Sequence, residues 1–136
     1  MKVILFERRF WELVATGAKV HTIRRPRKRP INVGDALSLR GWEGKPYRSK
    51  QRTLTEETCI AIRDVWIDCE GIIIGNDNGR WYYDRDRELL DAFAVSDGFA
   101  TFAELLSFTH FNRHLPFTGE LIQWGVHPML KGLGQQ

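Results

Sequence analysis

The chain has 136 residues, of which 43% are hydrophobic and 27% charged, and its formal net charge is +3. This length suits one compact domain that buries a core without help from disulfides or metals, and the composition is that of a soluble globular protein. No apolar run approaches the roughly 18 residues of a membrane span, and the opening apolar run is too short for a secretory signal. We therefore expect a cytoplasmic protein with no membrane partner.

Positive charge is concentrated in one quarter of the chain. Between Lys19 and Arg52 there are eleven lysines and arginines against two acids, a formal charge of +9, whereas the other 102 residues carry −6. Such asymmetry indicates a polyanionic partner. A solvated basic loop that keeps the protein in solution explains the charge equally well when the charge is considered alone.

Two elements precede the basic segment. The apolar run at residues 2–6 predicts a buried strand, and the apolar spacing at 7–16 predicts a helix. Gly17 supplies the left-handed residue that ends such a helix. Lys19 follows at once, where the negative end of the helix dipole favours a cation.

Residues 20–24 predict the second strand. Because side chains alternate along a strand, Thr22 and Arg24 share one face and His21 lies on the other. Lys19 has the wrong parity to lie beside Thr22 in a regular strand. The two can meet only if Lys19 belongs to the turn after the helix or if the strand is bulged.

Two basic loops follow. Prolines make 25–30 irregular, a strand is expected at 36–40, and the loop at 41–50 mixes aromatic residues with cations. Aromatic rings beside cations offer stacking faces and phosphate contacts, as in the binding of single-stranded nucleic acid. For Trp42 alone, packing against the core is as good an interpretation as contact with a ligand. The predicted ligand contacts are Arg24, Arg25, Arg27, Lys28, Arg29, Trp42, Lys45, Tyr47, Arg48, Ser49 and Lys50.

The second half of the chain continues the alternation of strands and helices. Its predicted elements are a β-rich segment at 53–68, a hairpin at 71–83 turning at Asn78-Gly79, helices from 86 to the break at Asp97-Gly98 and over 101–111, and a strand at 117–124. Five to six strands with three short helices predict an α+β domain, in the form of a small barrel. The domain spans 1–128, and the tail at 129–136 is expected to fray.

Cysteine and histidine provide little sign of a metal site. Cys59 and Cys69 are predicted to be buried thiols, because a disulfide is not expected in a reducing compartment. His110 and His114 have helical i,i+4 spacing, but a metal needs a third ligand that the sequence does not place, so surface or packing roles are favoured. We expect no metal and no cofactor.

Several short motifs together resemble the ASCH domain family. They are Gly17-x-Lys19-x-x-Thr22-x-Arg24 after a helix, Gly34-Asp35 opening a strand, Asp97-Gly98-Phe99 before a late helix, and the closing Glu120-Leu121-Ile122-Gln123-Trp124. The resemblance covers nearly the whole chain, and the hairpin at 71–83 looks like an addition to the smallest members. It implies a PUA-like fold, a small β-barrel of about five to six strands with flanking short helices.

The resemblance also implies a function. ASCH domains are thought to bind RNA or modified bases in a cleft lined by the motif, and some small bacterial members are amidohydrolases that deacetylate N4-acetylcytidine with a lysine, a threonine and a glutamate. Lys19 and Thr22 match the first two, and Asp97 stands where the glutamate is expected. The shorter side chain affects catalysis more than binding, because a displacement of about 1 Å can lower a rate roughly 10²-fold.

Four functions therefore remain open at this stage. The leading one is binding of RNA or a modified nucleoside; the second is amidohydrolysis, with Thr22 as nucleophile or water holder, Lys19 as proton acceptor and Asp97 as proton donor to the leaving nitrogen. A ribonuclease would use Tyr47, Ser49 and Lys50, and a protein adaptor would use Trp81, Tyr82 and Tyr83. In the purely structural interpretation Lys19 simply pairs with Asp97, and Thr22 is an ordinary strand residue.

Overall fold

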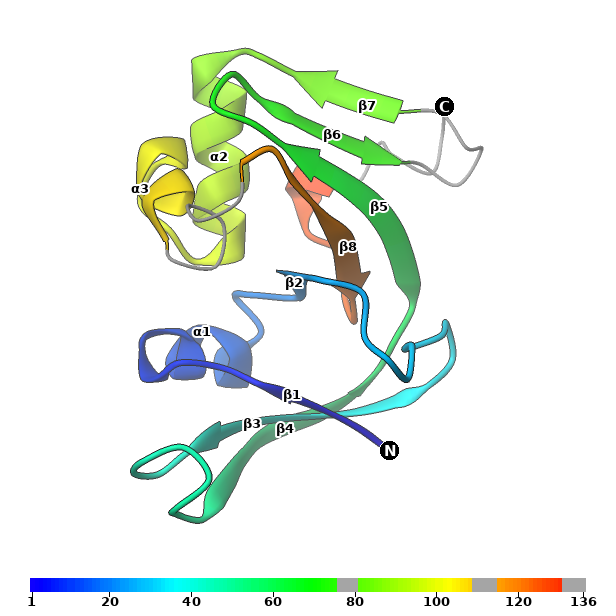
Figure 1. Cartoon of the computed structure of the whole chain (residues 1–136), viewed down its shortest axis with the longest axis vertical. Coiled ribbons are helices and arrows are strands. Elements are labelled where there is room, and N and C mark those ends of the chain that lie inside the picture. The colour runs from blue at the N-terminus through cyan, green and yellow to red at the C-terminus, as the bar shows by residue number, and fades with distance from the viewer. Residues whose placement is uncertain (76–80, 109–114, 131–136) are drawn as a thin grey trace.

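The computed structural model describes residues 1–75, 81–108 and 115–130, and within them eight strands form two sheets accompanied by short helices (Figure 1). The α+β class is thereby confirmed, with more strands than the five to six predicted. The elements are β1 (Lys2–Leu5), η1 (Arg8–Phe10), α1 (Trp11–Thr16), β2 (His21–Arg24), β3 (Ala36–Trp42), β4 (Gln51–Thr58), β5 (Ala61–Ile67), β6 (Ile72–Gly75), β7 (Trp81–Asp84), α2 (Arg87–Asp97), α3 (Phe102–Ser107), β8 (Phe117–Gln123) and η2 (Pro128–Leu130).

The smaller sheet has the order β1-β3-β4, with β1 parallel to β3 and β3 antiparallel to β4. The larger sheet has the order β2-β8-β5-β6-β7 and is antiparallel throughout. Pairing of β6 with β7 confirms the predicted hairpin, whose turn lies outside the described residues. Among the described strands no ladder joins the two sheets, so a closed barrel stays a prediction.

The predicted β segment at 53–68 is in fact two strands in different sheets, which accounts for part of the higher count. The chain crosses between the sheets at Cys59 and Ile60. The amide of Cys59 donates to Asp35 O at 2.9 Å, whereas the amide of Ile60 donates to Gln123 O at 2.8 Å. Figure 1 shows β4 continuing into β5 at this point. Both halves are strand-forming sequences, so local pattern alone gave no sign of the crossing.

The helices cover the two sheets separately. In Figure 1, α2 and α3 lie together beside the larger sheet, and α1 lies near the smaller one. Side-chain caps begin both later helices: the Asp86 carboxylate accepts from the amides of Glu88 and Leu89, and the Thr101 hydroxyl accepts from that of Glu104. Figure 1 also shows the end of α2 directed toward β2 and α1, where the motif residues lie.

Helix α3 ends at Ser107, earlier than the predicted 111. Phe108 adopts extended backbone angles, and its ring packs 5.9 Å from that of Phe10 and 5.3 Å from that of Phe99. Phe108 therefore lies outside the helix, and its ring packs against the first helical segment. His110 and His114 lie outside the described residues, so the roles expected for them are not tested.

Two smaller predictions need correction. Cys59 is buried as expected, but Cys69 is exposed, because it lies in a turn closed by the Asp68 carboxylate; both thiols are free. The frayed tail was predicted from 129, yet Leu130 is buried in the core, and residues 131–136 are not described. Across the described ranges, no helix combines the length and apolar character needed to cross a membrane.

Candidate functional site

The site begins at the turn between α1 and β2. Gly17 has φ of 84° and ends α1 in the left-handed conformation that glycine adopts without penalty. The amide of Lys19 donates to Leu13 O at 2.9 Å, so Lys19 belongs to this turn and precedes β2. Of the two arrangements that would let Lys19 approach Thr22, the structure has the turn and not the bulged strand.

Lys19 and Asp97 form a buried ion pair. Lys19 Nζ lies 2.7 Å from Asp97 Oδ1 and 2.7 Å from Asp97 O, and each residue is only 3% exposed. Asp97 is the last residue of α2, so the ammonium also meets a carbonyl at a helix C-terminus, where the dipole favours a cation. Lys19 thus interacts with the negative end of the α2 dipole, whereas the sequence predicted the end of α1.

His21 is a third member of this cluster, which the sequence analysis missed. Its Nδ1 lies 3.3 Å from Asp97 Oδ1, and its ring stacks on Phe93 with a 7° angle between the planes. Strand parity placed His21 away from Thr22, and nothing in the sequence showed that the end of α2 lies on that side. The one feature of the sequence that could have pointed to His21 is that it is a titratable residue two positions after the motif lysine, Lys19.

Hydrogen bonds assign the proton of His21. The Ser96 hydroxyl donates to Phe93 O at 2.6 Å, so its oxygen accepts from His21 Nε2, 3.1 Å away. The neutral ring then presents the lone pair of Nδ1 toward Asp97, without an aligned hydrogen bond from any described residue. The pair Nδ1 and Oδ1 can therefore hold one additional proton between them.

Burial and charge act together on the pKa values of this cluster. Burial lowers the pKa of Lys19, despite the opposing attraction of Asp97, and Arg24 lowers it further. Burial also lowers the pKa of His21, which favours the neutral ring. Burial alone would raise the pKa of Asp97, but the Lys19 ammonium, joined by His21 whenever its Nδ1 carries a proton, keeps that pKa below its ordinary value.

Thr22 and Arg24 lie on one face of β2, as predicted. Arg24 Nε donates to Thr22 Oγ1 at 3.2 Å, and Arg24 Nη2 donates to Leu5 O at 2.7 Å. The guanidinium also stacks 4.9 Å from the Phe6 ring centre. Burial lowers the pKa of Arg24 to about 10, so the side chain stays cationic at neutral pH. Because its oxygen accepts from Arg24, the Thr22 hydroxyl is free to donate its own proton.

These polar groups open onto one small pocket. Its volume is about 210 Å³, below the roughly 300–1,000 Å³ of pockets that hold drug-sized ligands, so it suits a planar base rather than a whole nucleotide. The lining residues are Leu5, Phe6, Glu7, Phe10, Lys19, Thr22, Ile23, Arg24, Asp97, Phe99 and Phe108. This lining combines polar groups with phenyl rings, which is what an aromatic heterocycle needs.

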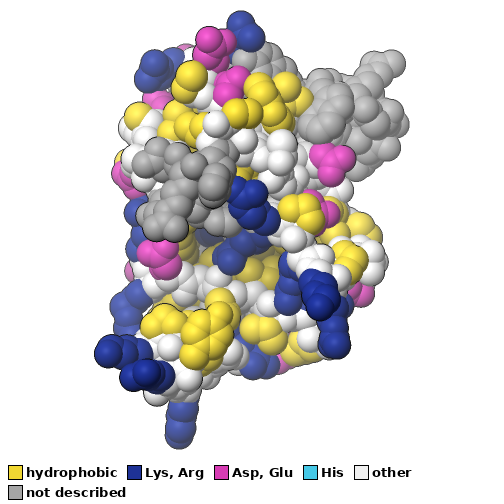
Figure 2. All heavy atoms as spheres, viewed as in Figure 1, with side chains coloured by type: hydrophobic (Ala, Val, Ile, Leu, Met, Phe, Trp, Pro, Cys, Tyr) yellow, Lys and Arg dark blue, Asp and Glu magenta, His cyan; other side chains and the backbone are white. Residues whose placement is uncertain are grey.

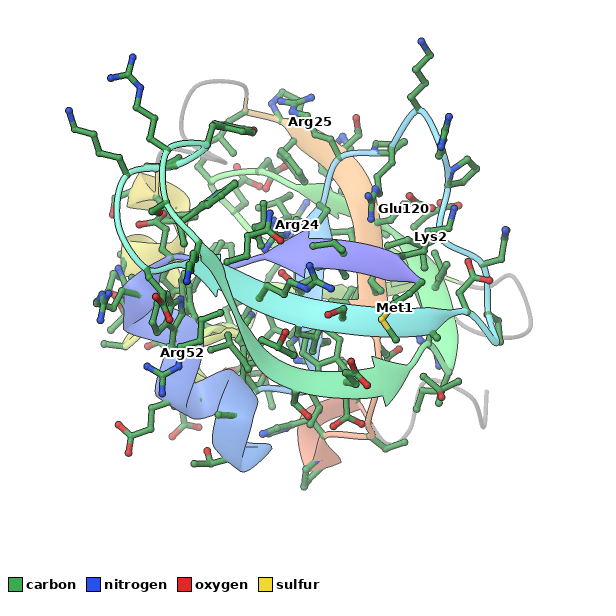
Figure 3. The ribbon with its side chains drawn as sticks, turned by 90° about the horizontal axis from the view of Figure 1, so that it is seen from below. Met1, Lys2, Arg24, Arg25, Arg52 and Glu120 are labelled. Carbon is green, nitrogen blue, oxygen red and sulfur yellow. The ribbon has the colours of Figure 1, made fainter. Side chains whose placement is uncertain are left out.

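The first basic loop lies outside this pocket. Arg25, Arg27, Lys28 and Arg29 are all exposed, and Arg27 donates to Val3 O at 3.1 Å. Figure 3 shows Arg24 and Arg25 on the same side of β1, with Arg52 across β1 and β3 from them. A separate hollow of about 280 Å³ is lined by Arg24, Arg25 and Arg27, and Arg24 also lines the pocket of the candidate site.

The second basic loop lies on another side of the pocket. Lys45, Arg48 and Lys50 are exposed, whereas Trp42 is half-buried at the end of β3. The Ser49 hydroxyl is used within the loop, because it accepts from the amide of Gly44 and donates to Lys45 O. In the described part of the chain, no three histidine, cysteine, aspartate or glutamate side chains gather closely enough to hold a metal ion.

The structure therefore brings Lys19, Thr22, Arg24 and Asp97 together and leaves the loop residues around them. It adds His21, Ser96 and the phenyl walls, which the sequence analysis did not single out. The side chains of Trp81, Tyr82 and Tyr83 lie outside what the structure describes. Comparison of the chain with family models, curated proteins and solved structures found no match.

Proposed function

We propose that the protein binds RNA or a modified nucleoside, with a base held in the pocket of Lys19, Thr22, Arg24 and Asp97. The convergence of these four side chains carries the proposal. They come from the turn after α1, from β2 and from the end of α2, and they meet at a base-sized hollow with phenyl walls. An ASCH domain with a PUA-like arrangement of the two sheets is the family assignment that accords with this proposal.

The pocket offers complementary contacts to a base. The Thr22 hydroxyl can donate to a ring nitrogen or carbonyl, while the rings of Phe10 and Phe99, 5.5 Å apart at 73°, offer apolar walls. Lys19 has three N–H groups and uses two on Asp97, so the third is available to a ligand acceptor. A base bound here would replace water at groups that are already positioned.

Cations around the pocket favour a ligand with phosphates. Figure 2 shows lysine and arginine side chains over the end of β3 and β4, on the side where the chain leaves β2, and in the hollow between them. Each phosphate neutralised on a single strand contributes about −0.7 to the slope of log affinity against log salt. RNA affinity measured from low to high salt should fall steeply; an affinity independent of salt would refute phosphate binding by these loops.

Amidohydrolysis is the second candidate, favoured by the buried Lys19 beside Thr22 in one pocket. A neutral Lys19 amine would take the Thr22 proton as Oγ1 attacks the acetyl carbon of N4-acetylcytidine. The C–N bond would then break, and Asp97 would pass that proton to the departing cytidine nitrogen. Water would finally hydrolyse the threonine ester and release acetate. Thr22 could instead hold the water that attacks the acetyl carbon directly.

One variant series tests both candidates. Thr22→Val keeps the branched shape of the side chain and removes the hydroxyl, whereas Thr22→Ser keeps the hydroxyl. N4-acetylcytidine turnover, followed by absorbance, should be lost in Thr22→Val and retained in Thr22→Ser if the protein is an enzyme. If the wild type binds RNA without turnover, binding alone is the function. Full turnover by Thr22→Val would overturn the catalytic assignment of Thr22 in either role.

A further inference from the structure

A second hollow adjoins the pocket of the candidate site. Its volume is about 490 Å³, and its lining residues are Leu5, Phe6, Glu7, Arg8, Trp42, Glu43, Gly44 and Pro46. Leu5, Phe6 and Glu7 line both hollows, which therefore share this segment as a common wall. A ligand that crosses this segment would reach both hollows.

An aromatic pair borders the second hollow, because Trp42 lines it and Tyr47 packs against Trp42. The Trp42 ring centre lies 5.2 Å from that of Tyr47, with 49° between the planes. Tyr47 is 86% exposed and has φ of 64°, a left-handed conformation that is uncommon for a bulky residue and is associated with functional loops. Although the Tyr47 ring touches Trp42, most of its surface is exposed, and an exposed aromatic face is what a nucleic acid base stacks on.

The loop that presents Tyr47 is braced by its own hydrogen bonds. Ser49 Oγ accepts from the Gly44 amide at 2.9 Å and donates to Lys45 O at 2.8 Å. The amide of Glu43 donates to Lys50 O at 2.9 Å and closes the loop. Because these bonds fix the loop before a ligand arrives, little ordering free energy is lost on binding.

Charge on this surface favours an anionic chain. The loop and its end carry four cations, Lys45, Arg48, Lys50 and Arg52, against the single acid Glu43. Arg8 donates to Glu43 O at 3.2 Å and stacks 4.3 Å from the Trp11 ring centre, so its guanidinium is held at the hollow. The one acid of the shared wall, Glu7, precedes Arg8 and attracts Arg24 electrostatically. Figure 2 shows cations beside an apolar patch at this end of the molecule.

We propose that the ligand is a single-stranded oligonucleotide that spans both hollows, with one base in the Lys19–Asp97 pocket and the next base stacked on Tyr47 and Trp42. The inference rests on the proposed function and extends it from one nucleoside to at least two consecutive nucleotides. The exposed cations of the loop contact the phosphates that follow. A free nucleoside fills the first pocket alone.

The test uses two probes, cytidine and a hexacytidylate RNA, with affinities measured by titration calorimetry. Because a base–aromatic stack contributes roughly 1–3 kcal/mol, Tyr47→Ala should weaken hexacytidylate binding by about 5- to 150-fold. Cytidine binding should be unchanged, and Tyr47→Phe, which keeps the ring, should bind both probes as the wild type does. The exposure of Tyr47 makes both variants compatible with the fold.

The outcomes separate the two proposals. Equal hexacytidylate affinities of Tyr47→Ala and wild type, with both probes bound, would overturn the two-hollow ligand and leave the proposed function standing. An equal loss of both probes in Tyr47→Ala would also overturn it, because Tyr47 would then act on the first pocket. A wild type that binds neither probe would overturn both proposals.

Discussion

The ion pair between Lys19 and Asp97 yields the sharpest prediction about stability. Replacing Lys19 by methionine keeps most of the length of the unbranched side chain but leaves the Asp97 carboxylate buried without its cation. Removing one partner of a buried pair typically lowers the free energy of unfolding by about 3–5 kcal/mol. His21, at 3.3 Å, is then the nearest described group that could supply a compensating charge.

The double variant Lys19→Met with Asp97→Asn provides the matched control. It removes both charges and keeps both shapes, and replacement of an entire buried pair is often neutral or stabilising. We therefore expect the double variant to lie within about 1 kcal/mol of the wild type, which implies a coupling free energy of at least about 3 kcal/mol between the two positions. The deficit of Lys19→Met should also shrink as the pH falls, because protonation of Asp97 or His21 removes the unpaired charge.

Urea unfolding at pH 7, followed by tryptophan fluorescence, measures these differences as changes in midpoint at constant slope. Two results would refute the reasoning: a Lys19→Met variant within about 1 kcal/mol of wild type, or a double variant as unstable as the sum of the single ones. The experiment also governs any assay of function, because a Lys19 variant that loses activity through unfolding says nothing about chemistry. Thr22→Ser avoids this difficulty, because it keeps the hydroxyl that accepts from Arg24, whereas Thr22→Val removes that acceptor and needs the same stability measurement.

Three further predictions concern stability. The pKa of His21 is lowered in the folded protein, so between that pKa and the ordinary 6.5 the unfolded chain binds more protons than the folded one. In this pH window the free energy of unfolding of the wild type should rise with pH more steeply than that of His21→Gln, by up to about 1.4 kcal/mol per pH unit. Urea unfolding that gives the same pH dependence for both proteins would contradict this. Gly41→Ala should sharply reduce stability, since the added methyl would overlap the Trp11 indole; unchanged melting would show that the indole can move. Gly98→Ala should cost about 1–3 kcal/mol, because φ is +103° and a Cβ would lie 2.8 Å from the Phe10 ring; a neutral effect in urea unfolding would exclude that strain.

Lys19 has a structural role whatever the ligand turns out to be. It neutralises Asp97 and caps the C-terminal carbonyl of α2, and so fastens the turn after α1 to the end of that helix. The same contacts also help to position the pocket, because Thr22 and Arg24 lie on β2, the strand that begins two residues after Lys19. The same contacts that stabilise the fold therefore place the polar groups of the site.

Much of the local structure could be predicted from the sequence, for physical reasons that act within a few residues. Gly17 indicated the end of α1, the alternation of β2 placed Thr22 beside Arg24, and Asn78-Gly79 indicated the hairpin of β6 and β7. Each depends on the conformational freedom of glycine or on the period of a strand. The concentration of charge in residues 19–52 is likewise a property of composition alone.

Other features depend on which segments meet in space, and only the tertiary structure decided them. The crossing at Cys59-Ile60 exists because one amide bonds to each sheet, and both flanking sequences favour strands equally. His21 joins Lys19 and Asp97 because the end of α2 comes to β2, although Asp97 lies 76 residues further along the chain. Likewise, the segment Leu5–Glu7 becomes the wall between two hollows only because residues far apart in sequence line each side of it. Long-range packing supplies these neighbours, and no local pattern encodes them.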